Sequence, residues 1–202
     1  FNTKIIHIST DYIFDGKKNK PYFETDLENP INYYGKTKLL AEKLIIDQYL
    51  KDSIILRTSM LYSNNKNNIF SNIVNQLKNE NRLQYVDDII CSPTSTTKLA
   101  EACINICESK FISGIYNFSD NGFCSRFEFA DFIQKYLSEH NNKYLKNKIL
   151  KINSANFNSI LKRPKYTVLN CKKFSQKYDF TFYHWKDNVR DLLKNTYKTS
   201  VT

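Results

Sequence analysis

Long apolar runs, paired cysteines and clustered histidines are all missing from this chain of 202 residues. No apolar run is long enough to span a bilayer, and residues 1–8 are too short and carry the wrong flanks for a signal peptide. The five cysteines include no Cys-x-x-Cys pair and have no histidine at metal-ligand spacing, so we interpret them as reduced thiols. The sequence therefore favours a cytoplasmic protein with no membrane partner and no recognisable metal site.

A focused basic motif is also missing, although the formal net charge is +10. The densest run of lysines, over residues 143–151, lacks the interleaved aromatic residues with which a single-strand binder stacks on bases. We therefore expect no nucleic-acid partner and attribute the charge to composition, although a basic surface would attract an anionic substrate. Because 41% of the residues are hydrophobic, the chain is predicted to be globular.

What the chain does contain, near its start, is a hydroxyl, a phenol and an ammonium group, on Thr10, Tyr34 and Lys38. Residues 5–9 form a short apolar run that predicts a buried strand, and Thr10 follows it directly. The apolar pattern over residues 30–45 has a helical period. Tyr34 and Lys38 are four residues apart on this helix, so both side chains leave the same face.

These three side chains suit proton transfer to a carbonyl oxygen. In this interpretation Tyr34 is the general acid and Thr10 orients the oxygen. Lys38 is the electrostatic partner of Tyr34, because a nearby ammonium group favours the charged form of a phenol. The plainer alternative is an amphipathic helix with a tyrosine on its flank, since Tyr-x-x-x-Lys is common by chance.

A second strand is predicted over residues 54–59, so the helix over 30–45 lies between two strands. A strand–helix–strand unit indicates a parallel sheet and an α/β fold. Binding groups gather at the carboxyl ends of parallel strands, where both Thr10 and Ser59 lie.

The rest of the chain alternates between helical and strand-like patterns. A capping box of Ser125 and Glu128 predicts a helix start, and Trp185 is expected to pack the terminal helix onto the domain. The predicted helices cover residues 69–77, 97–107, 126–137 and 187–193; the predicted strands cover 83–90 and 116–118; a basic connector covers 141–151.

Several short motifs follow one another in an order that resembles one enzyme family. They are Ser-Thr-Asp-Tyr-Ile-Phe-Asp-Gly at 9–16, Pro21-Tyr22, Asn29-Pro30, Tyr34-Gly35-Lys36-Thr37-Lys38-Leu39, Leu56-Arg57-Thr58-Ser59, Ser92-Pro93-Thr94 and Arg163-Pro164. Together they cover nearly the whole chain and resemble the extended short-chain dehydrogenase/reductase family. Within it, the chain looks most like the dTDP-4-dehydrorhamnose reductases.

The resemblance implies an oxidoreductase that takes a nucleotide-activated 6-deoxy sugar and reduces its 4-keto group. The expected reaction converts dTDP-4-dehydro-L-rhamnose to dTDP-L-rhamnose for polysaccharide biosynthesis, with NADPH or NADH as hydride source; Mg²⁺ cannot be read from the sequence. The implied catalytic residues are Thr10, Tyr34 and Lys38. The implied cofactor contacts are Ser9, Tyr34, Lys38 and Ser59, and the implied substrate contacts are Thr10, Asp11, Tyr12, Phe14, Met60 and Arg163.

Three points stay open at this stage. The family usually has a tryptophan where this chain has Met60, which leaves the sugar specificity open. Arg163 is either a bidentate partner of the substrate's pyrophosphate or a surface arginine held by Pro164. Glu24 and Asp26 either lie over the active site or are plain solvated loop acids.

The chain contains few glycines, and their positions limit which part of a dinucleotide-binding fold it can form. The four glycines, at positions 16, 35, 114 and 122, are far apart, so none forms the glycine-rich turn that holds a dinucleotide's pyrophosphate. The chain also begins at Phe1 and has one methionine. We therefore expect the C-terminal part of a Rossmann-type doubly wound parallel sheet with a small α/β substrate-binding domain. About three preceding strand–helix units of ~30 residues each would complete the sheet.

This expectation divides the chain into two parts. Residues 1–62 and 84–122 would be the remnant of the NAD(P)-binding Rossmann domain, and 63–83 and 123–202 the substrate-binding part. The strand over 5–9 would then have an unpaired edge, which a missing N-terminal half or a partner chain would cover. We expect this portion to be inactive by itself. Whether the protein forms a homodimer stays open.

Two other functions stay open from the sequence. An epimerase or dehydratase of the same family, acting on another nucleotide sugar, would keep Thr10, Tyr34 and Lys38. A non-catalytic regulatory or binding subunit would explain the lack of a glycine-rich turn but not the intact catalytic set.

Overall fold

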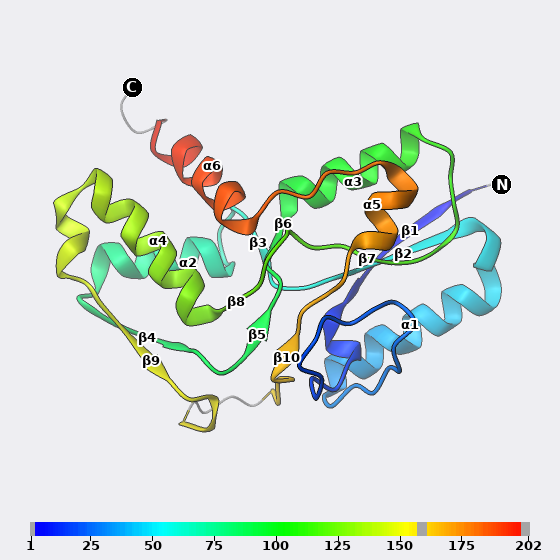
Figure 1. Ribbon diagram of the computed structural model, residues 1–202, viewed down its shortest axis with the longest axis horizontal. Helices are drawn as coiled ribbons and strands as arrows, with labels where there is room; N and C mark the ends of the chain where they lie inside the picture. The colour runs from blue at the N-terminus through cyan, green and yellow to red at the C-terminus, as the bar shows by residue number, and fades with distance from the viewer. Residues whose placement is uncertain (1–2, 157–160, 199–202) are drawn as a thin grey trace.

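The computed structural model describes residues 3–156 and 161–198. Its elements form two lobes that lie side by side in Figure 1. The sheet lobe contains three parallel strands in the order β1-β2-β7, namely β1 (Ile5–Thr10), β2 (Ser53–Thr58) and β7 (Gly114–Asn117). Because β1 and β2 pair in parallel, with Thr10 opposite Thr58, their carboxyl ends meet at one edge.

Helices cover both faces of this sheet. Helix α1 (Tyr33–Tyr49) packs on one face, whereas α3 (Thr96–Glu108) and α5 (Lys172–Tyr178) pack on the other. The alternation along β2 explains the difference between the faces. Leu56 contributes to the apolar core under α3 and α5, while the neighbouring Arg57 bonds to Glu42 of α1.

The helical lobe is built on a second apolar core. It consists of α2 (Ile69–Asn79), α4 (Arg126–His140), α6 (Trp185–Lys198) and the parallel pair β4 (Arg82–Val86) and β9 (Lys148–Ile152). Trp185 is buried against Phe129 and Phe132, with ring centroids 5.4 and 5.2 Å away. The predicted packing role of this tryptophan is therefore confirmed.

Short strands and 3₁₀ turns make up the remaining described elements. The strands are β3 (Leu61–Tyr62) paired with β6 (Thr94–Ser95), and β5 (Ile90–Cys91) between β10 (Tyr166–Thr167) and β8 (Cys124–Ser125). The turns are η1 (Asp11–Ile13), η2 (Leu50–Asp52), η3 (Asn142–Lys146) and η4 (Ser154–Asn156).

The predicted strand–helix–strand unit is confirmed, and so is the capping box that starts α4. The Glu128 backbone N–H donates to Ser125 Oγ at 3.0 Å, and the Ser125 N–H donates to Glu128 Oε2 at 2.8 Å. Two predictions were wrong. The strand expected over 83–90 ends at Val86, because the chain leaves β4 before it enters β5. The expected connector over 141–151 contains η3 and β9.

The expected unpaired edge of β1 is present in the described part of the chain, where β2 is the one strand that pairs with β1. Helix α5, which the sequence did not predict, packs on the sheet: Phe174 and Tyr178 belong to the same core as Leu56 and Phe118. Among the described residues, no helix is both long and apolar enough to cross a membrane.

Candidate active site

The carboxyl ends of β1 and β2 are joined by a buried carboxylate. Thr10 caps η1, since its Oγ1 accepts a hydrogen bond from the Tyr12 backbone N–H at 3.2 Å, and it donates to Asp11 Oδ1 at 3.1 Å. Ser59 Oγ donates to Asp11 Oδ2 at 2.6 Å. Three predicted site residues, Thr10, Asp11 and Ser59, therefore form one hydrogen-bonded group.

Burial raises the pKa of Asp11 to about 6, even though hydrogen bonds from Ser59, Thr167 and Thr10 favour its charged form. A carboxyl with this pKa changes its charge close to neutral pH. Asp11 is therefore a pH-sensitive group at the junction of the two strands.

Helix α1 approaches this junction closely because residue 35 is glycine. A Cβ on Gly35 would lie 2.1 Å from the Tyr12 carbonyl oxygen, which no side chain tolerates. The close approach places the ring of Tyr34 edge-on to Tyr12, with centroids 5.9 Å apart and an interplanar angle of 82°. Tyr34 keeps 47% of its surface exposed, so its phenol is accessible to a ligand.

Lys38 lies one turn further along α1 and faces the end of β1. Its Nζ donates to the Ile8 carbonyl oxygen at 2.5 Å. One more turn along, Glu42 is buried and accepts hydrogen bonds from Ser9 Oγ and from Arg57 Nη2, the latter at 2.7 Å. The Ser9 hydroxyl is therefore engaged inside the protein rather than presented to a ligand.

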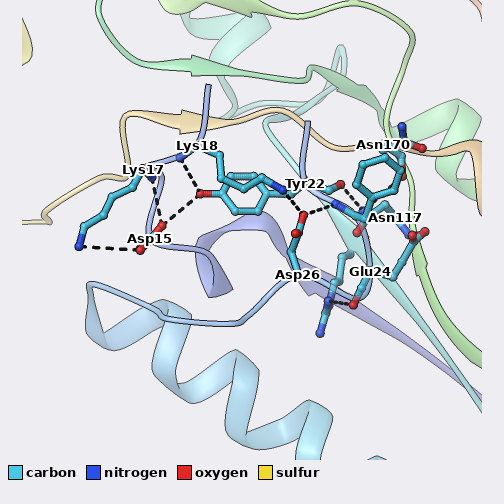
Figure 2. A network of polar contacts seen from close by, with 10 residues as sticks. Asp15, Lys17, Lys18, Tyr22, Glu24, Asp26, Asn117 and Asn170 are labelled. Atoms are coloured by element: carbon cyan, nitrogen blue, oxygen red, sulfur yellow. Dashed lines mark hydrogen bonds and ion pairs between the residues drawn. The ribbon is translucent and has the colours of Figure 1, made fainter. Parts of the chain in front are cut away.

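The loop after η1 is fixed to the sheet, as Figure 2 shows. Glu24 Oε1 accepts from the Asn117 backbone N–H at 2.9 Å, Asp26 pairs with Lys18, and Asn117 Nδ2 donates to the Tyr22 carbonyl oxygen at 2.9 Å. Glu24 and Asp26 are thus bound within the loop structure and are not plain solvated acids.

Two arginines that are distant in sequence act electrostatically on Tyr12 of this site. Burial raises the pKa of Tyr12 to about 12, and the guanidinium groups of Arg163 and Arg126 oppose that rise. Burial lowers the pKa of Arg126, and the positive charge of Arg163 adds to the effect. Neither arginine has a carboxylate partner within the described ranges, and the buried Nε of Arg163 has no hydrogen-bond partner there.

Two predicted substrate contacts differ from the rest. Phe14 is fully buried. Its ring stacks on that of Tyr22, with centroids 4.3 Å apart, and lies close to the Arg57 guanidinium, so Phe14 packs in the core next to the site. Met60 is half-buried with its sulfur 3.6 Å from the Cys91 sulfur, and its φ of 30° places it in the region that favours glycine. Such backbone strain is typical of functional sites.

Sequence reasoning missed Arg126 and the buried pair of Glu42 and Arg57. Arg126 begins α4 next to a pocket of about 420 Å³, which is also lined by Gln76 and Tyr85. No local pattern marks Arg126, because its relation to Arg163 arises only from the fold. In the described residues, no group of three or more acidic, histidine or cysteine side chains could hold a metal ion.

A comparison with known protein families places the whole arrangement in one of them. The family described as the RmlD substrate binding domain matches residues 1–198. The chain belongs to the RmlD substrate binding domain family. This family match spans both lobes, from β1 to the end of α6.

Individual relatives agree with this RmlD assignment. The chain is 35% identical over 189 residues to the spore coat polysaccharide biosynthesis protein SpsK of Bacillus subtilis, covering 94% of the chain and 63% of that protein. It is 33% identical to a dTDP-4-dehydrorhamnose reductase of Aggregatibacter actinomycetemcomitans, covering 95% and 66%. The chain thus spans just under two thirds of the length of these two relatives.

A solved structure supports the RmlD fold independently. The dTDP-4-dehydrorhamnose reductase of Bacillus anthracis, determined in complex with NADP, is 28% identical and superimposes with a TM-score of 0.85. The match covers 96% of this chain and 66% of that one. The Rossmann-like α/β class predicted from the sequence is therefore confirmed.

Proposed function

We propose that the protein carrying this chain is a reductase of nucleotide-linked 4-keto-6-deoxy sugars, with dTDP-4-dehydro-L-rhamnose as substrate and NADPH as hydride source. The single observation that carries this proposal is the placement of Tyr34 and Lys38 on α1, beside the joined ends of β1 and β2. Relatives named dTDP-4-dehydrorhamnose reductase, one of them bound to NADP, support the reaction and the cofactor.

The described residues fit one end of such a cofactor. Tyr34 is accessible, and the ammonium group of Lys38 lies at the carboxyl end of β1, where a ribose hydroxyl would find a donor. No glycine-rich turn for the pyrophosphate exists in this chain. When bound, NADPH would supply the hydride to the sugar's C4.

The chain's own residues would handle the oxygen and the proton. Tyr34 donates its phenolic proton to the developing alkoxide at O4 of the sugar. Lys38 stabilises the resulting phenolate electrostatically, and the hydroxyl of Thr10 orients the oxygen. Asp11 fixes Thr10 by accepting its hydrogen bond at 3.1 Å.

The two arginines would bind the nucleotide. Arg163 and Arg126 place two positive charges close together without carboxylate partners in the described residues, and a pyrophosphate would neutralise both. The pocket of about 420 Å³ beside Arg126, which Tyr85 and Gln76 line, would then take the nucleoside. In this arrangement the arginines anchor the substrate while its sugar reaches Tyr34.

The proposed division of labour follows the sequence-based boundaries. Residues 1–62 and 84–122 would serve the cofactor, and 63–83 and 123–202 the substrate. The packing qualifies this division, because α5 belongs to the sheet lobe and the whole of β4 (Arg82–Val86) belongs to the helical lobe. The role of Mg²⁺ has no support in the described residues.

The proposed reaction is tested by following NADPH oxidation by the full-length natural protein. Addition of dTDP-4-dehydro-L-rhamnose should produce turnover, with a 4-hydroxy sugar nucleotide as the product identified by NMR. The free sugar without its nucleotide should react far more slowly, because it lacks the pyrophosphate. An epimerase or dehydratase would leave NADPH unconsumed, and a non-catalytic subunit would bind the nucleotide without turnover. Either result would contradict the proposal.

A further inference from the structure

The segment Lys162–Lys165, termed here the arginine segment, carries Arg163 and lies between β5 and the loop after η1. On one side, the Lys165 carbonyl oxygen accepts from the Ile90 backbone N–H at 2.8 Å, and the Lys165 ammonium group pairs with Asp88. These contacts hold the end of the segment beside β5.

Towards the sheet lobe, the arginine segment packs against the loop after η1. A Cβ on Gly16 would lie 2.4 Å from the Cβ of Pro164, so the two backbones are in close contact. Asn32 makes the second connection, because its Nδ2 donates to the Lys162 carbonyl oxygen at 2.9 Å. The segment is therefore attached directly to the residue that begins the helix of Tyr34.

Asn32 performs two tasks with one amide group. Its Oδ1 accepts from the Gly35 backbone N–H at 2.8 Å and so caps α1, while its Nδ2 binds the arginine segment. The side chain is 7% exposed, so water competes little for either bond. Serine or aspartate can also cap a helix, but neither supplies an amide N–H on the far side.

We propose that Asn32 is a positioning residue that couples Arg163 to Tyr34. It stands two residues before Tyr34, and its bonded partner Lys162 stands one residue before Arg163. One amide group thus sets the distance between the group that binds pyrophosphate and the group that donates the proton. This proposal rests on the proposed function, because it takes Arg163 as the pyrophosphate ligand.

The test is a double-mutant cycle of Asn32→Ser and Arg163→Met in the full-length natural protein, with dTDP as the probe and calorimetry as the readout. Asn32→Ser should weaken dTDP binding about tenfold, which corresponds to about 1.4 kcal/mol. In the Arg163→Met background, Asn32→Ser should cause almost no further loss of dTDP affinity. NADPH affinity and the unfolding midpoint should stay at the wild-type values, because serine keeps the cap.

Two further variants keep this test decisive. Asn32→Thr also keeps the cap, is neutral and lacks the amide donor, so it should weaken dTDP as Asn32→Ser does. Asn29→Ser changes an exposed asparagine of the same loop and should leave dTDP binding unchanged.

Three results would overturn the proposal for Asn32. They are unchanged dTDP binding in Asn32→Ser, an equal loss with and without Arg163, or unfolding of both Asn32 variants, which would mark a purely structural residue. A wild-type protein that binds no dTDP would overturn the proposed function as well. If the wild type turns over and the losses of dTDP binding in the two single variants add up in the double variant, the coupling between Asn32 and Arg163 is overturned while the proposed function stands.

Discussion

Replacing Glu42 by glutamine should destabilise the protein strongly, because it removes one charge of a buried pair. Arg57 is fully buried, and Glu42 is 1% exposed. The guanidinium binds Glu42 through Nε, at 3.1 Å from both carboxylate oxygens, and through Nη2 at 2.7 Å. Glutamine keeps the shape but presents an N–H group to a cation that already has only donors.

The magnitude follows from what remains around Arg57 after the change. Breaking a buried ion pair from one side typically costs about 3–5 kcal/mol. Arg57 Nη2 still has Glu28 at 2.8 Å and Nη1 still has the Glu24 carbonyl oxygen at 3.1 Å, so we expect the lower end, about 3 kcal/mol. Glu28 is 30% exposed, and Glu28→Gln, the matched control, should cost about 1 kcal/mol or less.

Urea unfolding measures this difference directly. Far-UV circular dichroism reports the whole chain, and the fluorescence of Trp185, the single tryptophan, reports the helical lobe. Coincident transitions would justify a two-state free energy of unfolding. A loss for Glu42→Gln no larger than that for Glu28→Gln would refute the reasoning, because the pair would then behave like an exposed one.

Three further predictions concern the site. Gly35→Ala should displace α1 and abolish turnover, because its Cβ would meet the Tyr12 carbonyl oxygen at 2.1 Å; wild-type kinetics would contradict the close approach. The pKa of Asp11 is raised from 3.8 to about 6, so the folded protein holds this proton more tightly than the unfolded chain does. The resulting stabilisation is complete at a pH below 3.8 and is lost as the pH rises through 6. Lowering the pH from 7 to 5 should therefore raise the urea-unfolding free energy of the wild type by about 1 kcal/mol relative to Asp11→Asn, and equal pH slopes would disprove the assignment. Arg163→Met should raise the KM for the nucleotide sugar at least about tenfold, as expected for loss of a charge-assisted bond, with the KM for NADPH unchanged; a change in both would point to general damage.

Local patterns predicted the core of the fold because each carries its own physical signal. The apolar run before Thr10 and the helical period after Asn32 are enough to specify β1 and α1, and the capping box at Ser125 fixes the start of α4. Tyr34 and Lys38 could be placed together because the helix repeat alone brings them to one face.

The missed features depend on contacts that are distant in sequence. Strand β9 contains lysines at 148 and 151, so it resembled a charged connector, yet its apolar residues pair with β4 some 66 residues earlier in the chain. Phe14 was assigned to the substrate from its motif, but its burial on Tyr22 is decided by the loop that folds over it. Arg126 carried no local signal, since the groups around it, which include Arg163, Tyr12 and Tyr85, are distant in sequence.

The central claim is that Tyr34 donates the proton, and one comparison of variants tests it most directly. Tyr33 is the matched control, because it is the neighbouring tyrosine and is 79% exposed. Tyr34→Phe should lower kcat for reduction of dTDP-4-dehydro-L-rhamnose at least about 100-fold, the usual contribution of a general acid, with unchanged dTDP affinity, while Tyr33→Phe retains wild-type kcat. A Tyr34→Phe enzyme with kcat within a few-fold of wild type would contradict the account.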